Sequence, residues 1–464
     1  MALHQDFIEH LQNMFLPSRI ILGGEDLHIY GKDQTEDLFF QPDVVVKPEN
    51  IEEISAILRL CNDFKVPVTV RGAGTGLAGG ALPVKKGLVL SMEKFNKILT
   101  IDEKNLQVIA EPGVITEILQ NAVKEKGLFY PPDPASKGSC FIGGNVAHNS
   151  GGPKAVKYGV VKDYVLNLEV VLANGEVIWT GANTLKNSTG YNLTQLMVGS
   201  EGTLGVITKI VLKLLPHPKH TLLMLAPFPS AENACAAVSA VFRAGITPSA
   251  MEFIERNAMK WALDYVDESP VKMLENEAAY LLIEVDGNNQ DVLIADCEQI
   301  AEILTPFDCG EILFADSEEQ KASLWKVRRS INPSIVSFSH KKELDTVVPR
   351  AVLPEQLKKI KEIGAKYGIE TVCFGHAGDG NLHVNIVKKG LTEAQWKNDV
   401  PRATREMFEA VHELGGRISG EHGIGFVQKP YMDIMFSPLH LDLMRGIKKV
   451  FDPNGILNPE KIFD

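Results

Sequence analysis

The organisation of this chain follows from the stretch Val70-Arg71-Gly72-Ala73-Gly74-Thr75-Gly76-Leu77-Ala78-Gly79-Gly80, in which five of the last nine residues are glycine. It continues Val66-Pro67-Val68-Thr69-Val70, whose β-branched residues are typical of a strand. A strand that leads into such a loop predicts a backbone that approaches a ligand closely. Consecutive backbone N–H groups in such a loop form a concave anion site, so we expect a phosphate or pyrophosphate there.

Two other phosphate motifs do not fit this loop. Gly74, Gly76 and Gly79 satisfy the G-x-G-x-x-G pattern of a Rossmann dinucleotide site. That pattern should open a crossover helix of about a dozen residues, but the next apolar run, Gly87-Leu88-Val89-Leu90, follows too soon. A Walker A loop is excluded because no Gly-Lys-Ser/Thr follows. A glycine-rich turn without a ligand is the alternative that this loop alone leaves open.

Length and composition narrow the class of protein. A chain of 464 residues with 45% hydrophobic and 23% charged residues predicts two or three globular domains. A net charge of -12 argues against a nucleic-acid partner. The six cysteines form no C-x-x-C, so neither an iron–sulfur cluster nor a disulfide framework is expected. We expect a cytoplasmic protein without a signal peptide or transmembrane segment, which reaches a membrane only through a partner.

Hydrophobic patterning predicts an α+β fold. We expect a helix over 51–64 that Asn50 caps, a helix over 116–126, and a hairpin of strands at 168–172 and 177–179 around Asn174-Gly175. Pro216 and Pro218 mark a domain boundary. Beyond it, alternating strands and longer helices predict a second α+β domain with an antiparallel sheet.

Two further segments are rich in special residues. The segment 130–159 is dense in Pro, Gly, Asn and His, and a loop of that length inside a domain is usually functional. A second glycine-rich segment, Gly199-Ser200-Glu201-Gly202-Thr203-Leu204-Gly205, leads into an expected strand over 207–214. Both segments are candidates to line the same ligand site as the first loop.

Histidines gather around a turn late in the chain. His376 precedes Gly378-Asp379-Gly380, and His383 and Asn385 follow it two residues apart, on one face of an expected strand. Glu421-His422 adds a carboxylate and an imidazole in another glycine-flanked segment. Two histidines and a carboxylate suit zinc or ferrous iron. The alternative is a pair of structural histidines.

Charged side chains between these segments give one more candidate. Arg328-Arg329 follows Leu324-Trp325, and arginine suits bidentate carboxylate recognition, although at least one of the two is expected on a solvated helix face. Lys341-Lys342-Glu343 is expected to be an ordinary charged surface. A serine hydrolase is excluded because no G-x-S-x-G occurs.

Taken together, the glycine loops, the Pro131–Gly152 segment, the His376–Asn385 segment and Glu421-His422 resemble the FAD-linked oxidases of the vanillyl-alcohol oxidase and para-cresol methylhydroxylase fold. Within that fold they look like the D-2-hydroxyacid dehydrogenase branch, with D-lactate dehydrogenase, the glycolate oxidase catalytic subunit and D-2-hydroxyglutarate dehydrogenase. The resemblance implies an FAD-binding domain over 1–215, an α+β cap domain over 216–415 and a C-terminal segment over 416–464 that returns to the FAD domain.

The resemblance also implies a non-covalent FAD site. The residues that match the family's FAD-binding segments are Arg71, Gly72, Ala73, Gly74, Thr75, Gly76, Leu77, Pro132, Asp133, Pro134, Ser139, Gly143, Gly144, Asn145, His148, Asn149, Gly151, Glu201, Gly202, Gly205, Val206 and Ile207.

By the same resemblance, His376, His383 and Glu421 match the metal ligands. His422 matches the general base, Asn385 a substrate contact and Arg328 the arginine that holds the substrate carboxylate. The implied reaction is oxidation of a 2-hydroxy acid, in which the metal-bound hydroxyl loses its proton and the α-hydrogen passes to the flavin as hydride.

Two departures refine this expectation. Glu343 stands where D-2-hydroxyglutarate dehydrogenases, as aligned here, carry a lysine, which favours a small monocarboxylate, with D-lactate preferred to glycolate. The chain lacks cluster-binding cysteines, so electrons are expected to leave for an electron-transfer flavoprotein, a quinone or an iron–sulfur subunit, within a homo-oligomer or a hetero-complex. The alternatives are an oxygen-using oxidase, a flavin-dependent transferase of the ether-lipid alkyl synthase type, or a flavin-bearing electron-transfer subunit.

Overall fold

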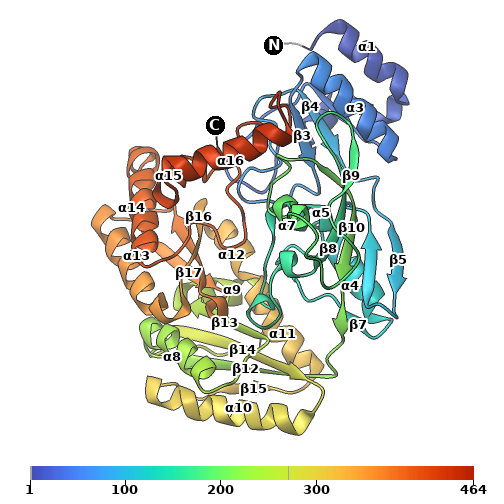
Figure 1. Cartoon of the computed structure of the whole chain (residues 1–464). Helices are drawn as coiled ribbons and strands as arrows, with labels where there is room; N and C mark the ends of the chain where they lie inside the picture. Colours follow the sequence, from blue (N-terminus) through green and yellow to red (C-terminus); the bar gives the residue numbers. More distant parts are fainter. Residues whose placement is uncertain (1–2, 270, 464) are drawn as a thin grey trace. The chain divides into compact units, whose positions relative to one another are not determined.

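The structure, a computed structural model, describes residues 3–269 and 271–463 (Figure 1). The chain forms two compact units. Unit 1 contains the chain through Ser150, Val160–His217 and the residues from Glu421 onward, and unit 2 contains Gly151–Gly159 and Pro218–Gly420. Apart from the segment 151–159, the chain passes from unit 1 to unit 2 between residues 217 and 218 and returns between residues 420 and 421. The expected domain boundaries were 215/216 and 415/416. Both units mix helices and strands, so the predicted α+β class is confirmed.

Unit 1 begins with a small sheet that carries the glycine loop. Its order is β1-β2-β4-β3, and β2, β4 and β3 run parallel. The strands are β1 (Ile20–Ile21), β2 (Val44–Val46), β3 (Val68–Arg71) and β4 (Leu88–Ser91). Helix α3 (Ile51–Phe64) joins β2 to β3, and Asn50 caps it as predicted, because the Glu53 N–H donates to Asn50 Oδ1 at 2.9 Å. Helix α1 (Gln5–Met14) packs its buried Phe7 and Leu11 into the same core.

A second sheet of unit 1 is antiparallel, in the order β5-β6-β10-β8-β9. Its strands are β5 (Ile98–Asp102), β6 (Gln107–Ala110), β8 (Val165–Val171), β9 (Val177–Trp179) and β10 (Val206–Lys213). Strands β8 and β9 form the hairpin that Asn174-Gly175 predicted. Other helices of unit 1 are α4 (Thr116–Lys124), α5 (Ile142–His148), α7 (Leu193–Met197) and α16 (Pro438–Phe451). Helix α4 ends two residues earlier than predicted, because the Lys126 N–H bonds back to Val123 in a tightened last turn.

Unit 2 is built on a seven-stranded antiparallel sheet in the order β15-β12-β14-β13-β17-β18-β16. Its strands β12 and β14 are labelled in Figure 1. The strands are β12 (His220–Phe228), β13 (Ala250–Glu255), β14 (Ala279–Gly287), β15 (Leu313–Ala315), β16 (Lys341–Val347), β17 (Thr371–Gly375) and β18 (Asn381–Val387). The predicted second domain with an antiparallel sheet is thereby confirmed.

Helices cover the two faces of this sheet. One face packs on α9 (Arg256–Tyr265), α11 (Glu318–Arg329) and α12 (Ile331–Phe338), together with alternate strand residues such as Leu282 and Phe374. The other helices that contact the sheet are α8 (Ala231–Arg243), α10 (Gln290–Leu304), α13 (Leu353–Tyr367) and α14 (Val400–Glu413). Among the described helices of residues 3–269 and 271–463, none combines the length and the apolar composition that a membrane span needs.

The short segment Gly151–Gly159 leaves unit 1 and packs with unit 2. The Lys157 ammonium lies 2.6 Å from Asp286 Oδ1, and the Tyr158 hydroxyl donates to the same carboxylate at 2.8 Å. Lys154 pairs with Glu284, also on β14. The sequence analysis placed this segment in the first domain, because its partners lie about 130 residues further along the chain.

We predict that Asp286→Ala loosens this segment. The Asp286 side chain is fully buried, so its removal leaves Lys157 without its main counter-charge and should cost about 3 kcal/mol. Hydrogen exchange of the amides in Gly151–Gly159 should then be roughly 100-fold faster. Glu298→Ala on the exposed side of α10 is the control. Equal exchange in the two variants would contradict the proposed anchoring.

Candidate active site

The glycine loop of unit 1 follows β3 directly, as predicted. Gly74 and Gly79 have φ of +72° and +73°, a backbone conformation that residues other than glycine rarely adopt. A Cβ on Gly74 would overlap the guanidinium of Arg71, so this arginine folds back over its own loop. The loop backbone and the Arg71 side chain therefore form one local structure.

Arg71 has the properties of an anion ligand. It is only 6% exposed, and its Nη1 has no hydrogen-bond partner within the part of the chain that the structure describes. Burial lowers the pKa of Arg71 from its usual range, although the negative charge of Asp33 partly opposes this. A buried guanidinium with an unused donor is costly unless an anion binds it. The loop and Arg71 therefore fit the pyrophosphate of FAD.

The second glycine-rich segment, 199–205, is linked to the first loop at Glu201. This residue is buried with φ of 53°, which is uncommon for a residue other than glycine. Its carboxylate accepts the N–H groups of Ile424 at 2.8 Å and Gly425 at 2.7 Å. Asn458 Nδ2 donates to the carbonyls of Gly80 and Glu201 at 3.0 and 2.7 Å. Segments around 80, 201, 424 and 458 therefore converge within unit 1.

His148, at the end of α5, lies against two of these segments. A Cβ on Gly80 would lie 2.8 Å from its Cε1, and a Cβ on Gly423 would lie 2.6 Å from its Nδ1. The Nδ1 atom is buried and has no hydrogen-bond partner among the described residues. An unpaired ring nitrogen beside two glycines fits a ligand surface, and the role of His148 at the FAD site stays a prediction.

Several predicted FAD residues have a structural explanation of their own. A Cβ on Gly143 would overlap Pro112, and a Cβ on Gly205 would overlap Val170. The side chain of Asn145 donates to Thr116 Oγ1 at 2.6 Å. Gly151 belongs to the segment that packs with unit 2.

The other assignments stay predictions. Pro132, Asp133, Pro134 and Ser139 lie in the irregular segment before α5, Gly144 lies in α5, Asn149 is its C-cap, Gly202 follows Glu201, and Val206 and Ile207 open β10.

Lys461 is a buried lysine that no sequence pattern predicted. Its ammonium is buried and donates to the Leu82 carbonyl at 2.6 Å, and burial lowers its pKa to about 8. It lies three residues after Asn458, at the C-terminal end of unit 1, and no motif marked it.

The second group of predicted residues lies on one face of the sheet of unit 2. In the pairing of β16 with β18, Glu343 lies opposite Asn385 and Asp345 lies opposite His383. Side chains two residues apart share a face, so these four point to the same side of the sheet.

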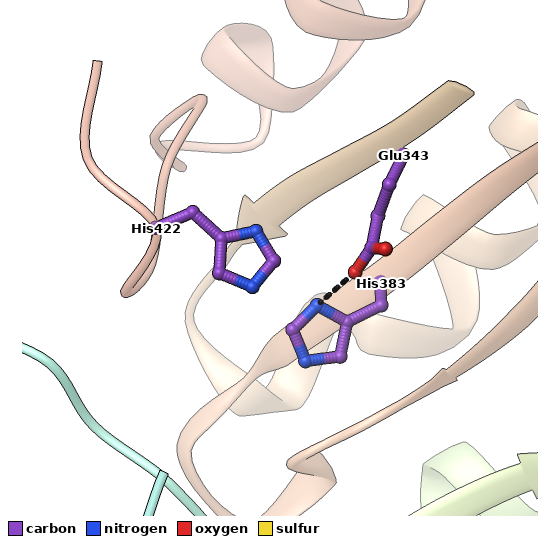
Figure 2. Close-up of side chains that lie close together, drawn as sticks. All are labelled: Glu343, His383 and His422. Carbon is purple, nitrogen blue, oxygen red and sulfur yellow. Dashed lines mark ion pairs between the residues drawn. The ribbon is translucent and has the colours of Figure 1, made fainter. Parts of the chain in front are cut away.

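The two imidazoles converge, as expected from the turn between them. Their ring centroids are 5.3 Å apart, and one nitrogen of each lies within 4.8 Å of the other. His376 Nδ1 lies 2.8 Å from Glu252 Oε1, and His383 Nδ1 forms an ion pair at 3.3 Å with Glu343 Oε1 (Figure 2). Two buried imidazoles that converge, one of them hydrogen-bonded to a carboxylate and the other close to one, fit a divalent metal ion.

Glu421 and His422 are the first residues of the last stretch of unit 1, immediately after Gly420 of unit 2. The Ser419 hydroxyl and the Gly420 N–H both donate to Asp345 Oδ2 at 2.9 Å. Asp345 is also 3.8 Å from His383 Nδ1. The peptide that carries Glu421 thus starts from a residue that is anchored on the histidine-bearing face of the sheet.

Arg328 is buried at 7% exposure, and its Nε donates to Glu252 Oε2 at 2.8 Å. Arg329 is exposed and lies 5.4 Å from the Trp325 ring, so the expectation that one of the two arginines is solvated is confirmed. Glu252, the partner of Arg328, was not among the predicted site residues. An acid within the otherwise apolar run Ala250–Ile254 was the available signal, but Glu255 close by made it ambiguous.

The expectation that Lys341-Lys342-Glu343 is a charged surface is wrong. The Lys341 side chain is 2% exposed and that of Glu343 is 10% exposed. The Lys341 ammonium contacts Glu343, Asn332 and Asn385 Oδ1, the last at 2.6 Å. Burial also lowers the pKa of Lys342 to about 8. Strand pairing with β18 buries this run, although its local composition is that of a surface.

Comparison with known proteins identifies the family of this chain. A model described as "FAD binding domain" matches residues 42–181, and one described as "FAD linked oxidases, C-terminal domain" matches residues 217–462. Together they define a flavin-dependent oxidoreductase. The chain belongs to the FAD-linked oxidases, and the resemblance drawn from the sequence is confirmed.

Relatives and solved structures extend this result. The chain is 42% identical to the glycolate oxidase subunit GlcD of Bacillus subtilis (strain 168), over 94% of this chain and 92% of that protein. It is 38% identical to the D-lactate dehydrogenase of Anaerostipes hadrus, over 96% of this chain and 95% of that protein. A crystal structure of p-cresol methylhydroxylase with substrate bound has the same fold, with a TM-score of 0.82 at 18% identity over 100% of this chain and 98% of that chain.

We predict that Arg71→Met weakens FAD binding. The substitution keeps much of the side-chain length but removes the buried charge, and each charge-assisted hydrogen bond lost costs about 1.5–3 kcal/mol. The dissociation constant of FAD should rise at least roughly 10-fold, measured by flavin fluorescence on titration of the apoprotein. Arg445→Met on the exposed face of α16 is the matched control. Unchanged FAD affinity in Arg71→Met would remove Arg71 from the site.

Proposed function

We propose that this protein oxidises a small D-2-hydroxy acid, with D-lactate as first choice, to the 2-keto acid and passes the electrons to a separate acceptor. The observation that carries the proposal is the pair of converging imidazoles on the sheet face that also buries Arg328, in a chain of the FAD-linked oxidases. Similarity to proteins named for glycolate and D-lactate supports the 2-hydroxy acid class.

In this proposal Arg71 and the loop 72–77 hold the FAD pyrophosphate, and His148 and Glu201 help to line the rest of the site. His376, His383 and Glu421 hold a divalent ion, zinc or ferrous iron. When bound, FAD accepts two electrons and the ion makes a coordinated hydroxyl more acidic.

The protein's own residues orient the substrate and move its proton. Arg328 binds the carboxylate through N–H groups that Glu252 does not use, since a guanidinium has five. The Asn385 amide contacts the substrate beside it. The imidazole of His422, labelled in Figure 2, takes the hydroxyl proton, because an imidazole accepts a proton near neutral pH. These roles together place the α-hydrogen for transfer.

Charges on the site face favour a substrate with one carboxylate. The Lys341 ammonium is engaged by Glu343, Asn332 and Asn385, so it is not placed to bind a second carboxylate. The Glu343 carboxylate would repel such a group. D-Lactate and glycolate avoid this cost, whereas D-2-hydroxyglutarate does not.

The acceptor is proposed to be another protein or a quinone. The six cysteines include no C-x-x-C that would hold an iron–sulfur cluster. The Bacillus subtilis relative is named as a subunit, which supports a hetero-complex. The protein partner in this proposal is an electron-transfer flavoprotein or an iron–sulfur protein.

A substrate panel tests the proposal. The holoprotein is mixed anaerobically with D-lactate, L-lactate, glycolate and D-2-hydroxyglutarate, and bleaching of the flavin absorbance is followed by stopped flow. We expect D-lactate to be fastest, glycolate slower, and D-2-hydroxyglutarate and L-lactate slowest. Chelation should stop the bleaching, and added zinc or ferrous iron should restore it. Absence of bleaching with every acid would favour the electron-transfer subunit instead.

We predict that His422→Ala slows flavin reduction roughly 10²- to 10⁴-fold, the usual contribution of a general base. The FAD content should stay unchanged, because the side chain is proposed to act on the substrate. His412→Ala, on the exposed side of α14, is the control. Unchanged reduction by D-lactate in His422→Ala would rule this residue out as the base.

A further inference from the structure

Glu252 is a buried acid near the centre of the sheet of unit 2. Its strand, β13, lies between β14 and β17, and the residue is 0% exposed. Strand pairing puts Ile254 opposite Phe374 and Phe374 opposite His383, so Glu252 shares the face of His383. A carboxylate in such a place is stable only when it is paired and hydrogen-bonded.

Two residues with different proposed tasks share this carboxylate. His376 Nδ1 lies 2.8 Å from Oε1 and 2.9 Å from Oε2. Arg328 donates from Nε to Oε2 at 2.8 Å, and its Nη2 pairs with the same oxygen. One residue follows β17 and the other lies in α11, so Glu252 links two elements that are distant in the sequence.

The contact with His376 decides which ring nitrogen faces a ligand. Both Glu252 oxygens lie within 2.9 Å of His376 Nδ1, and the Arg328 guanidinium pairs with the same carboxylate, which stabilises its ionised form. An ionised carboxylate only accepts hydrogen bonds, so Nδ1 of His376 carries a proton. This leaves Nε2 as the nitrogen that can bind a metal ion.

The contact with Arg328 fixes the plane of its guanidinium. Two of the five N–H groups face Glu252, and the guanidinium carbon lies 5.0 Å from the Phe374 ring centroid. Held by a carboxylate and a ring, the remaining donors have a defined direction.

We propose that Glu252 is a positioning residue that sets both the metal-binding nitrogen of His376 and the orientation of Arg328. This inference rests on the proposed function and adds to it that metal affinity and substrate affinity depend on one side chain. Conserving only the negative charge at this place would not be sufficient, because both contacts need the reach of a glutamate.

The simpler alternative is that Glu252 only neutralises charge in the sheet. The chain provides a matched control for this alternative in Glu284, which lies diagonally opposite on the neighbouring strand and on the same face. It is 6% exposed and is bonded by Lys154, Ser249 and Trp325, none of which is a proposed site residue. Replacing either glutamate by glutamine removes a buried charge of similar surroundings.

The test compares Glu252→Gln with Glu284→Gln in the full-length holoprotein. Zinc affinity is measured by titration of the metal-free protein with buffered zinc, and His376→Ala identifies the part that belongs to this site. A glutamine can offer its NH₂ group to Nδ1, which moves the ring proton to Nε2. We expect zinc binding at least 10-fold weaker in Glu252→Gln, together with a higher KM for D-lactate, and wild-type zinc affinity in Glu284→Gln. FAD content should be unchanged in both.

Equal zinc affinities in Glu252→Gln and wild type, or an equal loss in Glu284→Gln, would overturn the proposal. The proposal would also be overturned if the His376→Ala variant bound as much zinc as the wild-type protein. If Glu252→Gln does not fold, Glu252→Asp is measured in its place: it keeps the charge but is one methylene shorter, and zinc affinity equal to wild type would overturn the inference. Because zinc titration needs no substrate, failure of the hydroxy acid panel would refute the proposed function separately.

Discussion

Pairing of buried charges is the constraint on which the sheet of unit 2 depends. One face of this sheet carries acidic side chains in positions where apolar residues would be the ordinary choice, and each requires a counter-charge or donors within reach. Glu284 and Asp286 are paired by lysines from a distant segment, Glu252 by His376 and Arg328, and Glu343 by Lys341. Loss of a single partner would leave a charge without compensation. The face is therefore both rigid and specific, which suits a site that must hold a small polar molecule in one orientation.

Unit 1 carries the proposed site for an anionic cofactor, and this site depends on backbone groups more than on paired charges. A dinucleotide is long and anionic, and the proposed FAD site would contact it mainly through backbone and glycines rather than through many charged side chains. Arg71 is the conspicuous cation, and its unused donor indicates where the negative charge is expected. Glu201 acts on the protein itself, because its carboxylate accepts two backbone N–H groups and holds the segment 424–425 near the glycine loops.

The sequence predicted what is local and missed what depends on strand register. The strand before the glycine loop, the Asn50 cap, the β8–β9 hairpin and the shared face of His383 and Asn385 all follow from short patterns, and the structure contains each of them. Glu252 and the partners of Gly151–Gly159 were missed, because their contacts join residues more than 70 positions apart. Lys341 and Glu343 were mistaken for surface residues because the strand that pairs with them, β18, lies about 40 residues further along the chain. Only their pairing beside β18 shows that they are buried.

The nine residues that unit 2 takes from the middle of unit 1 have a consequence for the modularity of this protein. A fragment cut at the obvious boundaries, 218–420, would contain the whole seven-stranded sheet but lack Lys154 and Lys157. Glu284 and Asp286 would then be buried without the cations that balance them. The sequences of the two units are therefore interleaved. Recombination between relatives that exchanges one contiguous block would separate lysines from the buried carboxylates that they pair with.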